Sequence, residues 1–114
     1  MSPQSIDAVK LGNRIVLTPK ESLTYENCEG LEATLSEYNA RKKTEIILDL
    51  KAVSFLDSAT LELLLRTHEE LEKEGGVLKI VGMNAVCHDI LLATRLIHIF
   101  RVFEDVPEAL KSGI

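Results

Sequence analysis

Two short apolar runs with an amphipathic stretch between them restrict the folds that this chain can adopt. The runs cover residues 45–50 and 77–81, and residues 58–74 repeat apolar side chains at helical spacing. A continuous apolar run suits a strand that is covered on both faces of a sheet. Apolar strands that alternate with helices predict an α/β domain with a largely parallel sheet.

The N-terminal third predicts a hairpin followed by a helix. Residues 8–11 and 14–18 are β-prone, and the Gly12-Asn13 pair between them is typical of a tight turn. The first two strands should therefore pair antiparallel. Residues 23–41 repeat apolar side chains at helical spacing, which predicts an amphipathic helix of about four turns.

The C-terminal residues continue the alternation of strands and helices. Asn84 is a good N-cap for a third helix, and a short strand is expected at residues 101–103. Asp105, with Glu108 three residues later, resembles a capping box that opens a last helix. The chain, residues 1–114, is thus expected to form one domain with a mixed, mostly parallel sheet and the order β-β-α-β-α-β-α-β-α.

The composition argues against several partners and locations. A net charge of −5 and a pI of about 5.2 disfavour nucleic acid and an anionic membrane surface as partners. No apolar run approaches the roughly 20 residues that a membrane-spanning helix needs, so no direct membrane insertion is expected. Residues 1–10 lack the apolar core of a signal peptide. We therefore expect a cytoplasmic domain.

Patterns for catalysis and metal binding are missing from the sequence. It contains no Gly-x-Ser-x-Gly elbow, no Gly-x-Gly-x-x-Gly and no P-loop. Cys28 and Cys87 are too far apart for a metal-ligand pair and are expected to be buried, reduced thiols. His68 is expected to be partly buried on its helix, and His88 and His98 are isolated. We expect no enzyme activity, no cofactor and no metal.

The helix that begins at residue 58 combines a carboxylate with a small hydroxyl. Asp57 and Ser58 follow the apolar pair Phe55-Leu56. A helix N-terminus concentrates unpaired N–H groups and the positive end of the dipole, so it tolerates a phosphate well. Ser58 is therefore a candidate for phosphorylation. Because Ser and Asp are both preferred N-caps, a purely structural role also explains either residue.

Four blocks of the sequence occur in an order that is typical of one family. They are Asp57-Ser58-x-x-Leu61 with the strand before it, the Gly-Gly pair and strand at residues 75–81, residues 91–103, and residues 105–110. Together these blocks resemble the STAS domain, the family of the bacterial anti-sigma factor antagonists. The resemblance covers about residues 8–112 and implies an STAS-like fold for nearly the whole chain.

The resemblance also implies a function in partner switching. In this family the serine or threonine after the Asp is phosphorylated by a serine kinase that is also an anti-sigma factor, and a phosphatase removes the phosphate. Only the dephosphorylated form sequesters the anti-sigma factor and so frees the sigma factor. Carried over to this chain, Ser58 is the phosphoacceptor and Asp57 its family-matching neighbour. Whether the domain forms a homodimer is left open.

The residues after Ser58 depart from the family pattern. Ala59 and Thr60 stand where a small residue and then glycine are usual, and Glu62 stands where a small or apolar residue is common. Thr60 and Glu62 are expected to make the helix entrance bulkier and more negative. The binding face should include Asp57 and Ser58, with Ala59 and Glu62 as candidate contacts. The departures also fit an alternative function, a STAS scaffold or regulatory subunit of a stress-signalling complex or of a lipid-transport ATPase.

Overall fold

The computed structural model describes residues 6–26, 28–39 and 43–112 of the chain. Within these ranges the elements follow the expected order, with an unpredicted 3-10 turn, η1 (Leu96–His98), before the last strand. The strands and helices are β1 (Ile6–Leu11), β2 (Arg14–Pro19), α1 (Cys28–Asn39), β3 (Glu45–Asp49), α2 (Ser58–Lys73), β4 (Val77–Val81), α3 (Ala85–Ala93), β5 (Arg101–Phe103) and α4 (Val106–Lys111).

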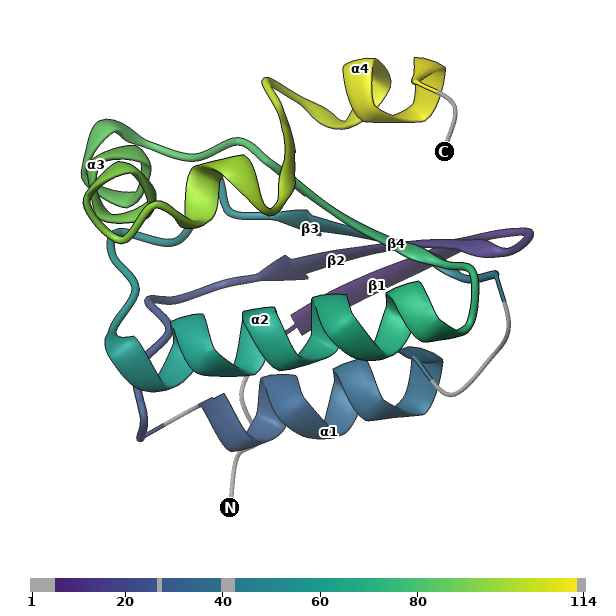
Figure 1. Cartoon of the computed structure of the whole chain (residues 1–114), viewed down its shortest axis with the longest axis horizontal. Helices are drawn as coiled ribbons and strands as arrows, with labels where there is room; N and C mark the ends of the chain where they lie inside the picture. The colour runs from purple at the N-terminus through teal and green to yellow at the C-terminus, as the bar shows by residue number, and fades with distance from the viewer. Residues whose placement is uncertain (1–5, 27, 40–42, 113–114) are drawn as a thin grey trace.

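The strands form one mixed sheet in the order β1-β2-β3-β4-β5 (Figure 1). β1 pairs antiparallel with β2, and all other neighbours pair parallel. Gly12 in the hairpin turn has a φ of +70°, a left-handed conformation that glycine adopts without strain. The predicted hairpin and the predicted α/β fold with a mostly parallel sheet are confirmed.

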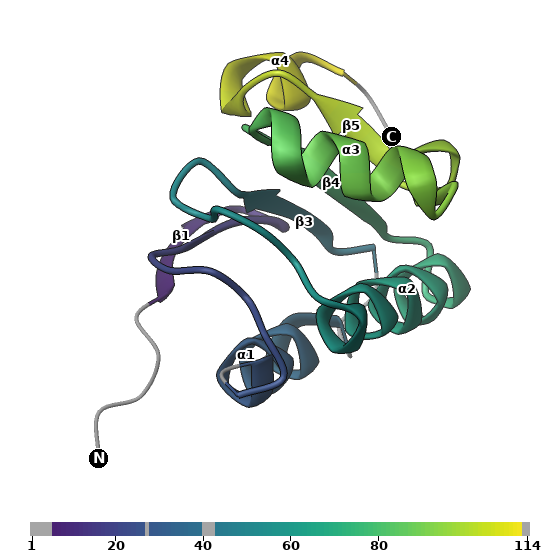
Figure 2. The ribbon, with the colours of Figure 1, turned by 90° about the vertical axis from the view of Figure 1, so that its left-hand side faces the viewer.

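Helices cover both faces of the sheet, which explains the continuous apolar strands. α1 and α2 lie side by side on one face, and α4 lies on the other (Figure 2). In β3, Ile46 and Leu48 face the larger core, to which α1, α2 and α3 contribute, whereas Ile47 faces a smaller core under α4. All three side chains are fully buried. Because successive side chains of a strand point to opposite faces, burial of both faces requires an apolar run.

Lys79 interrupts β4, which the sequence pattern predicts to be fully apolar. Its side chain is completely buried. The ammonium Nζ lies 3.0 Å from Oε2 of Glu45, which is also buried. Nζ also donates to the carbonyl oxygens of Ala109 and Ser112, each at 2.9 Å. Lys79 therefore ties the C-terminal end of α4 to the sheet, a role that apolar patterning does not indicate.

α1 is shorter at its start than the periodicity predicts. It begins at Cys28 and not near Leu23. Leu23 forms a parallel β-bridge with Leu56, and its N–H donates to the carbonyl of Phe55 at 3.4 Å. The chain is therefore extended at Leu23, although its side chain joins the same core as the helix. The predicted end of the helix near Arg41 lies outside the described residues.

α2 buries a wider stripe than the sequence predicts. Leu63 and Thr67 are buried together with Leu61, Leu64 and Leu71 of the apolar repeat, whereas Leu65 is half-buried. α1 packs along this helix and covers the added side chains. His68 is half-buried, as expected, and its ring packs edge-on against Phe100 with centroids 5.9 Å apart. Within the described ranges, no helix combines the length and the hydropathy that membrane crossing requires.

Candidate functional site

The carboxyl ends of the parallel strands meet at one edge of the sheet, and three loops gather there. These loops, residues 20–26, 50–57 and 82–84, are here called the loop edge. Ser54 connects them, because its N–H donates to Ser22 Oγ at 3.2 Å and its carbonyl accepts from Asn84 Nδ2 at 3.1 Å. α2 and α3 both begin at this edge (Figure 1). In open α/β sheets, this is the edge where binding sites commonly lie.

Asp57 caps α2 and joins two loops of the loop edge. Its Oδ1 accepts the N-cap hydrogen bond from the Thr60 N–H at 3.0 Å. Its Oδ2 accepts from the Tyr25 N–H at 2.7 Å. The N–H of Asp57 itself donates to the Leu23 carbonyl at 3.3 Å. The carboxylate of Asp57 thus bonds the start of α2 to the loop that precedes α1.

These hydrogen bonds favour the charged form of Asp57. Burial by itself would raise the pKa of this carboxyl, but the N–H groups of Thr60 and Tyr25 outweigh burial and hold the pKa below its usual value. A lowered pKa in the folded state means that the carboxylate stabilises the fold above the unfolded-state pKa of about 3.9. That stabilisation is lost as the pH falls through the lower, folded-state pKa.

Replacing Asp57 with alanine should lower the free energy of unfolding by about 1–2 kcal/mol at pH 7, because two N–H groups lose their acceptor. The difference from the original protein should shrink as the pH is lowered from 5 toward about 3. Urea unfolding across this pH range measures both effects. Ser58→Ala is the matched control, with an expected change within about 0.5 kcal/mol. An equal loss in both variants would contradict the assignment of the cap to Asp57.

Ser58 is the first residue of α2, and its side chain is exposed. Among the described residues, the side chain that caps the helix belongs to Asp57, so the Ser58 hydroxyl is not needed for this bond. The sequence pattern left open which of the two residues is the N-cap. The geometry assigns that role to Asp57.

The residues after Ser58 differ in their exposure. Ala59 is half-buried, and Glu62, one turn along α2, is exposed. Thr60 is completely buried, so the expectation that it makes the helix entrance bulkier is wrong. Thr60 shares a face of α2 with Leu64 and Thr67, and this face is turned toward the protein interior. Ala59, Thr60 and Glu62 are the departures from the family pattern. Glu62 alone among these three is charged, and its side chain lies on the surface near the start of α2.

Three exposed apolar side chains at or beside the loop edge are missed by sequence reasoning. Tyr25 is 71% exposed, Phe55 is 43% exposed, and Val86 in the first turn of α3 is 52% exposed. Tyr25 falls within the range predicted as the first helix and Val86 within the third predicted helix, and the helical pattern singles out neither as an exposed side chain. Exposed aromatic residues beside a candidate site are typical of a protein-binding surface.

The cysteines and histidines form no second site in the described ranges. Cys87 is buried, as expected, whereas Cys28 is half-buried, and both thiols are free. Burial raises the pKa of both thiols, and the negative charge of Asp57 raises that of Cys28 further. Across the described ranges, no three or more His, Cys, Asp or Glu side chains are grouped as metal ligands would be.

Comparisons with known proteins agree with this arrangement. A family model described as the STAS domain matches residues 5–109. No curated protein sequence matches the chain significantly.

Solved structures of similar fold cover nearly the whole chain. An anti-sigma-factor antagonist (STAS) domain protein from Planctomyces limnophilus is 21% identical, with a TM-score of 0.84 over 92% of this chain and 94% of that chain. An anti-sigma factor antagonist from Mycobacterium paratuberculosis is 25% identical, with a TM-score of 0.81 over 96% and 95% of the two chains. The Bacillus cell fate determinant SpoIIAA in its phosphorylated form is 18% identical, with a TM-score of 0.74 over 94% and 97%.

Proposed function

This chain belongs to the STAS domain family, and on that premise we propose that it is an anti-sigma factor antagonist. Its partner is an anti-sigma factor that is also a serine kinase, and the complex forms only while Ser58 is unphosphorylated. A phosphatase returns the protein to its binding form. The protein acts in the cytoplasm by binding, without contact to nucleic acid and without catalysis of its own. The similar structures described as antagonists support this proposal.

The observation that carries the proposal is the division of roles at the start of α2. Asp57 supplies the capping bond and holds the loop before α1, while the Ser58 side chain is exposed to an approaching kinase. Thr60 is completely buried, which disfavours it as an acceptor. The backbone of Ser54 is engaged on both sides by the neighbouring loops. Ser58 is thus the best-placed hydroxyl on this helix start.

The charge balance at this position favours a switch that leaves the domain folded. A phosphate adds about −1.5 to −2 charges at pH 7. The helix dipole favours that charge by roughly 0.3–1 kcal/mol, and the exposed Glu62, four residues on, opposes it by about 0.2–0.5 kcal/mol. In an interface the same charge must lose its hydration, and a like-charge contact there costs several kcal/mol. Phosphorylation should therefore weaken binding far more than folding.

The partner-binding face in this proposal consists of the loop edge and the first turns of α2. Its residues on α2 and its cap are Asp57, Ser58, Ala59 and Glu62. The exposed aromatic side chains of Tyr25 and Phe55 extend it, since aromatic residues often anchor protein interfaces.

Partner binding of Ser58→Ala and Ser58→Asp tests the switch. The partner is first obtained by co-purification with Ser58→Ala from the native cytoplasm, and mass spectrometry identifies it and locates the phosphate on the original protein. Binding is then measured by calorimetry with the purified partner. Ser58→Ala should bind as the unphosphorylated protein does, and Ser58→Asp at least tenfold more weakly, a loss of about 1.4 kcal/mol or more.

The control for this test places the same charge elsewhere. Ser36 is exposed on α1, so Ser36→Asp adds one negative charge away from the loop edge and should leave the affinity unchanged. Equal affinity of Ser58→Ala and Ser58→Asp would sink the proposed switch. A phosphate found at Ser54 and not at Ser58 would show that the proposal names the wrong residue as the switch.

A further inference from the structure

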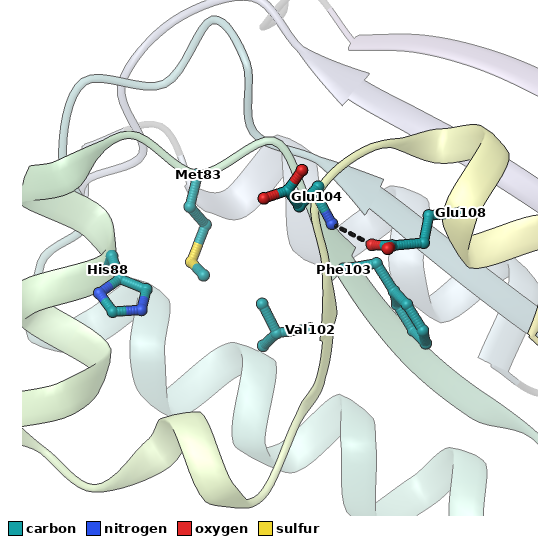
Figure 3. A pocket seen from close by; sticks show the side chains of 6 residues that line it. All are labelled: Met83, His88, Val102, Phe103, Glu104 and Glu108. Atoms are coloured by element: carbon teal, nitrogen blue, oxygen red, sulfur yellow. Dashed lines mark hydrogen bonds between the residues drawn. The ribbon is translucent and has the colours of Figure 1, made fainter.

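A cleft of about 440 Å³ opens between α3, β5 and α4, beside the loop edge (Figure 3). Its lining residues are Met83, His88, Val102, Phe103, Glu104 and Glu108. Met83 directly precedes Asn84, whose side chain donates to the Ser54 carbonyl at 3.1 Å. Through Met83 the cleft adjoins the 82–84 loop of the loop edge, which is bonded to the loop that leads to Ser58. The proposed function does not use it.

The lining combines an apolar floor with an acidic side. Met83, Val102 and Phe103 are half-buried, and Met83 lies between His88 and the two glutamates in Figure 3. Glu104 and Glu108 are exposed. The Glu104 N–H donates to Glu108 Oε1 at 2.7 Å, which holds that carboxylate in place.

The positive charge of Lys79, beside Phe103, is already paired within the protein. The ammonium of Lys79 lies 5.4 Å from the centroid of the Phe103 ring, but it is paired with Glu45 and bonded to the end of α4. The cleft thus repels phosphates and carboxylates and suits a cation with an apolar stem.

We propose that this cleft receives a lysine or arginine side chain of the same partner that binds the loop edge, an inference that rests on the proposed function. The aliphatic stem lies on Met83 and Val102, and the charged head is bound by Glu104 and Glu108. A protein side chain fits better than a free small molecule. Small-molecule sites bury most of their ligand, whereas the three polar lining residues of this cleft, the two glutamates and His88, are all exposed.

Small probes test the chemistry of the cleft without the partner. In NMR titrations, n-butylguanidinium should shift the methyl signals of Met83 and Val102 in a saturable manner, with a Kd of roughly millimolar order. n-Butanol and butyrate, which lack the cation, should shift them far less. The Glu104→Lys variant should lose the response to n-butylguanidinium. Equal shifts with n-butanol, or none with n-butylguanidinium, would overturn the proposal.

The partner itself provides the second arm, in the Ser58→Ala background so that phosphorylation cannot interfere. Adding Glu104→Lys should weaken binding at least tenfold without changing thermal unfolding, and the effect should decrease at high salt. Glu37→Lys on α1, also exposed, is the charge-matched control. If Glu104→Lys binds as tightly as its parent, the cleft proposal fails while the Ser58 switch stands. If Ser58→Ala and Ser58→Asp bind equally, the switch fails, and the probe titration still tests the cleft.

Discussion

Replacing Lys79 with alanine is expected to lower the free energy of unfolding by about 3–5 kcal/mol. The substitution leaves the carboxylate of Glu45 in the protein interior without its closest partner, 3.0 Å away. Arg14 contacts the other oxygen of Glu45 at 3.4 Å, but its side chain is partly exposed and compensates only in part. The carbonyls of Ala109 and Ser112 also lose their donor, so α4 should loosen from the sheet.

Urea unfolding followed by circular dichroism measures this loss, and a double variant separates its causes. Glu45→Gln combined with Lys79→Met removes both buried charges and keeps similar volumes. It should be more stable than Lys79→Ala, because no buried charge then lacks a partner. Hydrogen exchange should still report faster opening of α4 in the double variant, since the carbonyl bonds remain broken. A double variant that is no more stable than Lys79→Ala would show that the ion pair is not the cause.

Replacing Gly76 with alanine should destabilise the protein by about 3 kcal/mol, the upper end of what overpacking usually costs. A Cβ at this position would meet the backbone oxygen of Thr44, which cannot rotate away, and it would also press on Leu71. The same Thr44 oxygen accepts from the Val77 N–H at 3.0 Å, where β4 starts beside β3. Relief of the clash therefore requires a shift of strand backbone.

Gly12→Ala is the matched control for this prediction, measured in the same denaturant series. Gly12 has a φ of +70°, but a Cβ there would meet no atom within 4 Å. Its substitution should cost only the strain of the left-handed conformation, about 1 kcal/mol. If both variants lose the same stability, the close approach at Gly76 is not what makes glycine necessary there.

The site was predictable to the extent that its chemistry is local. Asp57 and Ser58 are recognisable from the sequence because a helix start selects small polar residues over a few positions. The capping residues Asn84 and Asp105 were predicted for the same reason, and both accept the expected backbone N–H. The exposed Tyr25 was missed, because its neighbours repeat at helical spacing although the chain there is a loop.

Strand and helix positions, the mostly parallel sheet and the serine at the start of α2 follow from short-range patterns, since periodicity and cap chemistry act over a few residues. The roles of Asp57, Lys79 and Leu23 depend instead on distant segments. Asp57 binds Tyr25 across 32 residues of sequence, and Lys79 binds Ala109 across 30. Leu23 leaves the helix to pair with Leu56. Only the packing of the chain brings these groups together, so the bond between Asp57 and Tyr25, the buried ion pair and the loop edge are decided by the tertiary structure.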